Sequence, residues 1–278
     1  MNLSKTDKEN FYSKGYIHIK NFLDNKAIEE LKSSATKKSN IESQGKRYSI
    51  IEDLNVRSYL GNNSLINVIK VLLGSKSYFL HDASILDMKY PYNNVTWHRD
   101  NPCRKTNVGP DWDGNLNYNV VTTLLYLRSS NETSTGLSLI PASHKKNFSQ
   151  NIKNYLRFFH SSTRSVNLTR PIRKGIENII GKEIHYEAGD LVIFLSNLYH
   201  SAITIGDFSK YNRQAIVARF GGEGFHSINY INYVLNLRDD MNIYDKSIYK
   251  NDFFNFLKSK NLFIEPPKEK YHIKGAYY

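Results

Sequence analysis

The sequence lacks the cysteines and the long apolar runs that would place it outside the cell or in a membrane. Cys103 is the single cysteine among 278 residues, so an internal disulfide is impossible and a reducing compartment is expected. No apolar run approaches the roughly 18 to 20 residues of a membrane-spanning helix. The polar N-terminus, residues 1–15, has no secretory h-region. These absences predict a cytoplasmic protein without a membrane span.

Acidic residues are almost absent from one segment of the chain. Residues 145–182 contain nine Lys or Arg and one acid, Glu177, so they contribute +8 to a formal net charge of +12. Such an asymmetry favours an anionic partner, for example a phosphate, a carboxylate or a nucleic acid. The alternative is a solvated basic surface without a partner.

No internal repeat, low-complexity tract or linker divides the chain. At 278 residues with 40% apolar side chains, it is long enough to bury a substantial core. We therefore expect one domain over residues 1–278. Its parts are a helical lead-in at 1–75, a strand-rich core at 76–221 with a basic, mostly helical insertion at 145–183, and a C-terminal extension at 222–278.

Helix signals concentrate in the lead-in. Ser4 and Asp7 have capping-box spacing, and Gly15 suits the C-terminal end of the helix that they would begin. Asp24 is a candidate N-cap for a second helix, and Gly74 would end a third. We expect helices at residues 5–14, 24–34, 64–73 and 252–258, and a strand at residues 16–19.

Short runs rich in β-branched residues dominate the chain from residue 76 onwards. They are bounded by polar residues, glycine or proline, which is typical of antiparallel strands in a sandwich or barrel. The runs are YFLHDASILDMKY, NVVTTLLYLR, GLSLIP, LVIFLS, AITIG and QAIVARF.

A candidate metal site begins with His98 and Asp100. Residues two apart in a strand share a face, so both side chains would point into the same space. His200 lies at the far end of a later apolar strand and is the best third ligand. Two histidines and one carboxylate leave three coordination positions open, which is the arrangement of non-haem Fe(II) oxygenases. Arg213 begins the next strand-like run, where its guanidinium would bind the distal carboxylate of 2-oxoglutarate through a two-pronged hydrogen bond.

Four segments resemble the phytanoyl-CoA dioxygenase-like (PhyH) branch of the Fe(II)/2-oxoglutarate oxygenases. In chain order they are LSKTDKENFYSKGYIHIKNFLDNKAIEEL, WHRD at 97–100, GLSLIPASHK at 136–145, and GDLVIFLSNLYHSA followed by RQAI. The resemblance spans roughly residues 3–221. It implies a mainly β fold with flanking helices, namely the double-stranded β-helix or jelly roll of the cupin type.

The resemblance also implies roles for individual residues. His98, Asp100 and His200 would bind Fe(II), Arg213 would bind 2-oxoglutarate, and Thr123 would be a further co-substrate contact. Arg219 shares a face with Arg213, and we assign it to structure or to the substrate. Ala202 departs from the family pattern, because members often have a co-substrate-binding serine there. Ala142 stands in place of a common turn glycine.

The implied reaction is hydroxylation of an unactivated C–H bond with Fe(II), 2-oxoglutarate and O₂, releasing succinate and CO₂. A carboxylate at Asp100 favours hydroxylation or desaturation over halogenation, since related halogenases have a small residue at that position. No catalytic side chain beyond the metal ligands is expected. The basic segment suggests a small anionic substrate, such as a sugar, a lipid, an acyl group or a natural-product intermediate.

Two other functions remain possible at the level of sequence. One is an AlkB-like nucleic-acid oxygenase, although only Tyr155, Phe158 and Phe159 interleave aromatic rings with the basic residues. The other is a jelly roll that binds a metal without catalysis. Structural zinc prefers four protein ligands, often cysteines, and the sequence offers three ligands without a cysteine.

Overall fold

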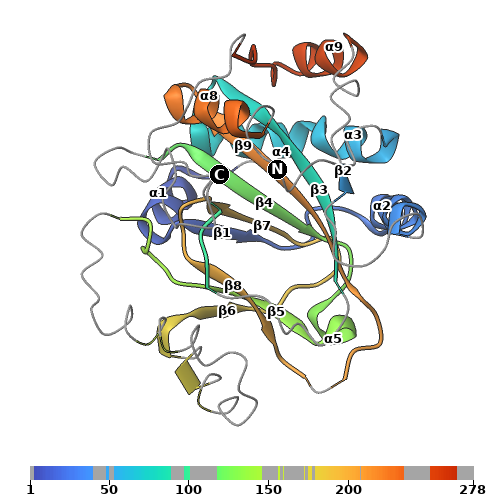
Figure 1. Ribbon diagram of the computed structural model, residues 1–278, viewed down its shortest axis with the longest axis vertical. Coiled ribbons are helices and arrows are strands. Elements are labelled where there is room, and N and C mark those ends of the chain that lie inside the picture. Colours follow the sequence, from blue (N-terminus) through green and yellow to red (C-terminus); the bar gives the residue numbers. More distant parts are fainter. Residues whose placement is uncertain are drawn as a thin grey trace.

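Two antiparallel sheets face each other in the computed structural model (Figure 1). The larger sheet has the order β1-β7-β4-β9-β3-β2, and the smaller has the order β6-β5-β8. The strands are β1 Tyr16–Ile19, β2 Tyr48–Ser49, β3 Ser77–Met88, β4 Val120–Tyr126, β5 Thr135–Leu139, β6 Lys182–Ile184, β7 Leu191–Leu195, β8 His200–Thr204 and β9 Arg213–Gly222. The expected double-stranded β-helix is confirmed.

The structure describes only part of the chain. The described residues are 3–39, 48–49, 53–88, 97–100, 118–145, 156, 159, 172, 175–176, 179–206, 208–234 and 251–267. Most of the basic insertion expected at 145–183 lies outside them. Its described residues before Gly181 are helical, apart from Lys145 in the preceding turn, and Lys182 opens β6.

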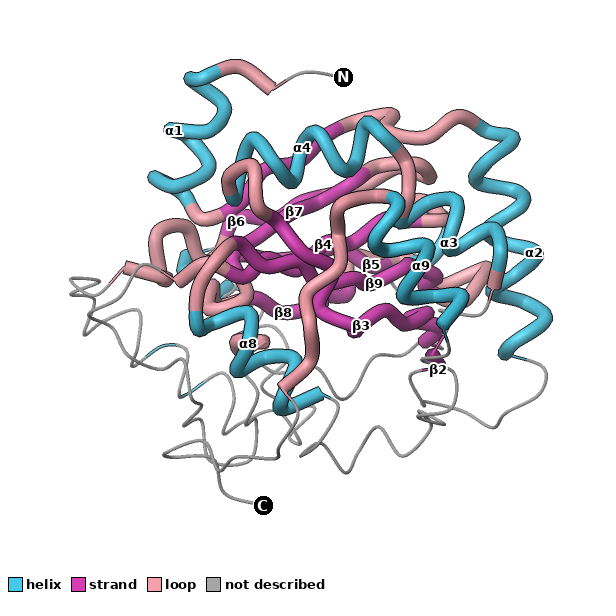
Figure 2. The backbone as a smooth tube through the Cα atoms, turned by 90° about the horizontal axis from the view of Figure 1, so that it is seen from above, coloured by secondary structure: helices cyan, strands magenta, loops and turns pink. Residues whose placement is uncertain are grey.

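Helices cover the outer face of the larger sheet. Figure 2 shows α2, α3, α4 and α9 gathered along one side of the strands. Their apolar side chains form one core with the outward-facing residues of β3, β4, β7 and β9. The helices are α1 Lys5–Lys14, α2 Asn25–Ser39, α3 Leu54–Leu60, α4 Asn63–Leu73, α5 Ser130–Thr133, α8 Phe225–Asn232 and α9 Asn251–Ser259. Among the described residues, no helix is long and apolar enough to cross a membrane.

The N-terminal helix begins and ends as its capping residues predict. The Ser4 side chain accepts from the Asp7 amide, and the Asp7 carboxylate accepts from the Ser4 amide, which completes a capping box. Gly15 ends the helix in the left-handed conformation, with φ of 88°. A Cβ atom there would lie 2.6 Å from the His144 ring, so this position requires glycine for its contacts as well as its backbone.

Side chains of the larger sheet alternate between the helices and the space between the sheets. Along β9, Ile216 and Ala218 pack in the core that the helices cover, whereas Ala215 and Val217 face the smaller sheet. Arg213 and Arg219 share the second face by the same alternation. The interior of the fold is therefore lined by every second residue of the larger sheet.

A bulge interrupts β3 beside β9. The register passes from Phe79 opposite Phe220 to Ala83 opposite Ala218, so three residues of β3 face the single residue Arg219. His81 lies within the bulge with φ of 57°. Its ring is buried among aromatic rings of the helical side, at centroid distances of 6.1 Å from Phe79, 6.4 Å from Phe253 and 5.7 Å from Phe254.

The burial of His81 predicts a loss of stability in weak acid. Burial lowers the pKa of His81 to about 3, against about 6.5 in an unfolded chain. The contribution of neutral, buried His81 to the free energy of unfolding is complete above pH 6.5. It is lost as the pH falls toward 3, because only the unfolded state takes up a proton in that range. The loss reaches at most about 1.4 kcal/mol per pH unit.

We expect His81→Asn, which tolerates the left-handed backbone, to show a shallower loss of unfolding free energy between pH 6 and pH 4. Urea unfolding of both proteins at pH 7, 6, 5 and 4 measures this. Parallel pH profiles for wild type and variant would contradict the assignment.

Candidate metal centre

His98 and His200 lie opposite each other across a short antiparallel pairing. The His98 amide donates to the His200 carbonyl at 3.0 Å, and the His200 amide donates to the His98 carbonyl at 2.9 Å. Residues that exchange both backbone hydrogen bonds project their side chains from the same face of the ladder. The two imidazole centroids are accordingly 4.2 Å apart.

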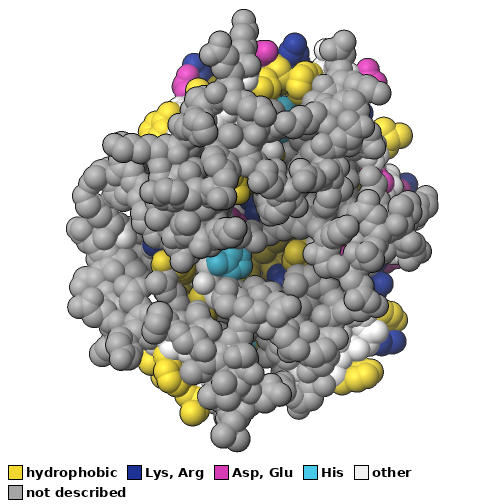
Figure 3. All heavy atoms as spheres, viewed as in Figure 1, with side chains coloured by type: hydrophobic (Ala, Val, Ile, Leu, Met, Phe, Trp, Pro, Cys, Tyr) yellow, Lys and Arg dark blue, Asp and Glu magenta, His cyan; other side chains and the backbone are white. Residues whose placement is uncertain are grey.

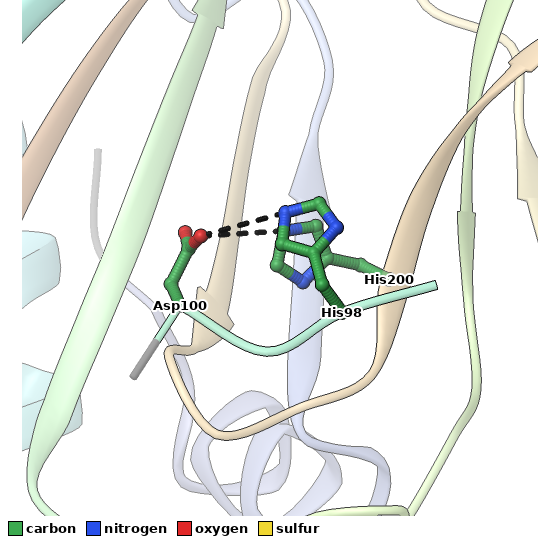
Figure 4. A group of neighbouring side chains, drawn as sticks. All are labelled: His98, Asp100 and His200. Atoms are coloured by element: carbon green, nitrogen blue, oxygen red, sulfur yellow. Dashed lines mark ion pairs between the residues drawn. The ribbon is translucent and has the colours of Figure 1, made fainter. Parts of the chain in front are cut away.

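Asp100 completes the group from the segment that carries His98. Its amide donates to the Ser196 carbonyl at 2.7 Å, which fixes the backbone two residues beyond His98. Its Oδ1 atom lies 3.7 Å from Nε2 of each histidine. The candidate ligand atoms all lie within 4.8 Å of one another, and Figure 4 shows the three side chains converging. The structure thus brings together the three residues proposed from the sequence.

A backbone carbonyl sets the tautomer of His200. Nδ1 lies 3.0 Å from the Leu198 carbonyl oxygen, which can only accept a hydrogen bond. Nδ1 therefore carries the proton, and the Nε2 lone pair points toward Asp100 and His98. A metal-binding histidine characteristically has its other ring nitrogen held in this way. The Phe194 ring, 4.5 Å away by centroid, packs against the same imidazole.

The second oxygen of Asp100 is held by two donors from the larger sheet. Thr122 Oγ1 and Arg219 Nη2 each donate to Oδ2 at 3.0 Å. Thr122 Oγ1 is also 2.9 Å from Ser196 Oγ. Asp100 therefore presents Oδ1 to the histidines while its Oδ2 is fixed by the sheet.

The role of Arg219 goes beyond the assignment made from the sequence. It is buried and bridges two carboxylates, with Nη1 at 2.6 Å from Asp82 and Nη2 at 3.0 Å from Asp100. Burial by itself lowers the pKa of Arg219, but Asp82, Tyr230 and Asp100 together raise it above its ordinary value. The sequence predicted that Arg219 shares a face with Arg213, because the two residues are an even number of positions apart in one strand. It did not reveal the contact with Asp82, because the bulge in β3 brings Asp82 to Arg219.

Arg213 lies on the same interior face at the opposite end of β9. It is buried, and its Nη2 lies 3.3 Å from the Tyr126 hydroxyl. Tyr126 stacks on Tyr186 with centroids 3.4 Å apart. Burial raises the pKa of Tyr126, so its hydroxyl keeps its proton at neutral pH.

A mostly apolar row separates the two arginines. Ser84 of β3 pairs with Val217 of β9, which pairs with Leu124 of β4, which pairs with Val192 of β7. All four are interior-facing by strand alternation. This row lies between the candidate metal ligands and Arg213.

Thr123 does not face the candidate metal centre, which corrects the assignment made from the sequence. Its hydroxyl donates to the Ala218 carbonyl at 3.0 Å, and its strand neighbours Val121 and Leu125 lie in the core that the helices cover. The preceding residue, Thr122, faces the interior and binds Asp100. The error is one residue of strand phase, which transfers a side chain to the other face of the sheet.

Trp97, the residue before His98, packs against residues of the insertion. Trp97 forms a buried cluster with Ile140, Ile176 and Ile180, and Leu156 packs against it. Ile176, Ile180 and Leu156 come from the basic segment. Figure 3 shows histidine, hydrophobic and basic side chains within a hollow on the viewed face of the molecule.

The sequence matches the model of one protein family, described as phytanoyl-CoA dioxygenase (PhyH), over residues 11–205. It has no match among curated proteins. The fold is similar to solved structures at 14–15% identity, a level that shows a shared fold.

Three of these structures are informative. HygX from Streptomyces hygroscopicus with iron bound has 15% identity and a TM-score of 0.59, over 80% of this chain and 88% of that chain. EctD from S. alaskensis with 2-oxoglutarate and 5-hydroxyectoine has 14% identity and a TM-score of 0.54, over 79% and 76%. The epimerase SnoN with Fe³⁺, alpha-ketoglutarate and nogalamycin RO has 14% identity and a TM-score of 0.53, over 77% and 82%.

The geometry predicts that a divalent transition metal stabilises the folded protein. The unfolded chain does not hold His98, Asp100 and His200 together, so a metal at about 100 times its Kd adds about 2.7 kcal/mol. We expect Tm to rise when Ni(II) or Co(II) is added and to return to the value of the metal-free protein after chelation. His200→Ala should remove most of this shift, whereas His185→Ala, a change at an exposed histidine, should retain it. Equal shifts in Tm for wild type, His200→Ala and His185→Ala would show that the metal binds elsewhere.

Proposed function

Because this chain belongs to the phytanoyl-CoA dioxygenase family, we propose that it is an Fe(II)- and 2-oxoglutarate-dependent oxygenase that hydroxylates an unactivated C–H bond of a small molecule. One observation carries the proposal. His98, Asp100 and His200 converge on one point, and the buried Arg213 lies farther along the same interior face. Solved structures with this fold contain iron, 2-oxoglutarate or both.

The three candidate ligands suit iron better than a structural metal. They offer two imidazole nitrogens and one carboxylate oxygen within 4.8 Å of one another. This donor set leaves coordination positions for a bidentate 2-oxo acid and for O₂. Structural zinc takes four protein ligands, and the described residues bring together three.

Arg213 and Tyr126 would bind the far carboxylate of 2-oxoglutarate. The guanidinium presents paired N–H donors that match a carboxylate, and the Tyr126 hydroxyl, 3.3 Å from Nη2, adds an O–H donor beside them. Tyr126 would thus supply the hydroxyl that Ala202 lacks relative to other family members. The protonated state of Tyr126, favoured by its burial, is the state that this contact requires.

The chain's own residues position and shield the reactants. Bound iron and 2-oxoglutarate would supply the oxidising power, with O₂ as oxidant and succinate and CO₂ as products. The row of Val217, Leu124 and Val192 excludes water along the path to Arg213. No side chain is required to act as a nucleophile or a general base.

The basic segment supports an anionic substrate. Leu156, Ile176 and Ile180 belong to residues 145–183 and pack with Trp97, the residue next to His98. This packing holds part of the basic segment close to the candidate metal ligands. A phosphate or carboxylate on the substrate would gain favourable charge interactions there.

Arg213 should be required for co-substrate binding but not for iron binding. Anaerobic addition of Fe(II) and then 2-oxoglutarate to the apo-protein should give the weak visible charge-transfer band of an iron–2-oxo acid chelate. Arg213→Ala should lose the band at the same 2-oxoglutarate concentration, because the far carboxylate loses its two-pronged partner. Arg128→Ala is the matched control, since Arg128 lies near the same end of the sheet but bonds Gln214 and stacks on Tyr211. Iron binding without a band in wild type would favour a non-catalytic metal protein.

Asp100 should be required for turnover. We expect Asp100→Ala to lower succinate release about 100-fold or more, because the carboxylate is one of three protein ligands. Measuring succinate with and without each member of a panel of phosphorylated and carboxylated small molecules tests the substrate class at the same time. Normal iron content together with normal succinate release in the variant would remove Asp100 from the site.

A further inference from the structure

Two buried carboxylates share one guanidinium beside the candidate metal ligands. Arg219 Nη1 lies 2.6 Å from Asp82 Oδ2, and Nη2 lies 3.0 Å from Asp100 Oδ2. The Tyr230 hydroxyl donates to the same Asp82 oxygen at 2.8 Å. All four side chains are buried. Asp82, Arg219 and Asp100 carry a net formal charge of −1, which a divalent cation beside Asp100 would compensate.

The bulge in β3 creates this arrangement. Leu80, His81 and Asp82 occupy the stretch of β3 opposite Arg219, and Asp82 Oδ2 accepts a hydrogen bond from Nη1 of the guanidinium. Leu80 packs with Tyr230 of α8 in a separate apolar cluster. The same irregularity therefore brings Asp82 to Arg219 and brings α8 to Asp82. Bulges commonly re-aim side chains next to functional sites.

The shared guanidinium constrains how Asp100 can bind a metal. Arg219 and Thr122 both donate to Oδ2, which leaves Oδ1 as the atom directed at the two histidines. Asp82 holds the other side of the guanidinium. Without the Asp82 charge, Arg219 would be able to turn both of its terminal nitrogens toward Asp100 and form a two-pronged ion pair with it. Such a pair would compete with the metal for Oδ1.

We propose that Asp82, Arg219 and Tyr230 are positioning residues that keep Asp100 in a one-oxygen binding geometry, and that Asp82 tunes metal affinity through Arg219. The proposal rests on the metal site of the proposed function and deepens it. It makes tight metal binding depend on Asp82 in the β3 bulge. It also links α8 to the metal, because Tyr230 of α8 donates a hydrogen bond to Asp82. Residues that orient metal ligands typically change metal affinity 10- to 100-fold when replaced.

The test is titration of the apo-protein with Co(II) alone, without O₂ or 2-oxoglutarate, followed by visible absorption. Asp82→Asn keeps the shape of the side chain and removes its charge. We expect its Kd for Co(II) to rise about tenfold or more, with an altered cobalt spectrum, because Arg219 competes for Asp100. Thermal unfolding of each protein, measured in parallel, shows whether the variant is folded.

Asp190→Asn is the matched control. Asp190 is also buried, and it pairs with His18 at 2.8 Å and accepts from the Asn21 amide at 2.9 Å, on a turn before β7. Its loss removes a buried carboxylate without touching Arg219. Its Kd for Co(II) should stay within about twofold of wild type, because distant sites act independently.

Tyr230→Phe decides the question if Asp82→Asn does not fold. It keeps the ring in its apolar cluster and removes only the hydrogen bond to Asp82, so we expect Kd to rise about threefold. A wild-type Kd in the folded variants, even with a lowered Tm, would show a purely structural role and overturn the inference. Failure of the wild-type protein to bind Co(II) would overturn the metal site itself, and the inference with it.

Discussion

The pairing of His98 with His200 is the constraint on which the candidate site depends. Two backbone hydrogen bonds place the imidazoles side by side, although the residues are about a hundred positions apart in the chain. The His98 segment adds a short edge to the smaller sheet, and two residues later the Asp100 amide bonds Ser196 of the segment that follows β7. The ligand group therefore forms only where the two sheets meet. Its geometry is set by backbone hydrogen bonds, which are less adaptable than side-chain contacts.

Charge balance is the second constraint. A buried arginine between two buried aspartates is costly to desolvate, and it persists because each group has a partner of opposite sign. Removing one partner from such a set leaves an uncompensated charge in a medium of low dielectric. The larger sheet thus contributes more than a scaffold. Through Thr122 and Arg219 it determines which oxygen of Asp100 faces the histidines.

Local signals in the sequence predicted the elements that they directly encode. The capping box at Ser4 and the glycine at position 15 gave the bounds of α1, and β1 and α9 were also anticipated. The short helices α3, α5 and α8 were not predicted, because helices of four to eight residues carry too little periodicity. At the site, His98, Asp100 and His200 were found by motif, whereas Asp82 was not, since its position follows from a bulge. The assignment of Thr123 to the co-substrate site was wrong by one position. All seven residues of β4 are buried, so no alternation of polar and apolar residues shows which of them face the interior.

The spacing of the two interior arginines relates the candidate metal centre to the site proposed for the far carboxylate of 2-oxoglutarate. Arg213 and Arg219 are six residues apart on one strand, so they share a face and their Cα atoms are separated by ~20 Å. Between them, β9 presents only Ala215 and Val217 to the interior, and both are small. One arginine is committed to Asp100, and the other stands beside Tyr126 at the far end. A single strand thereby fixes the distance between Arg219, which holds Asp100, and the buried Arg213. Small side chains in this interval obstruct a ligand less than large ones would, which is consistent with the short dicarboxylate of the proposed function lying beside Ala215 and Val217.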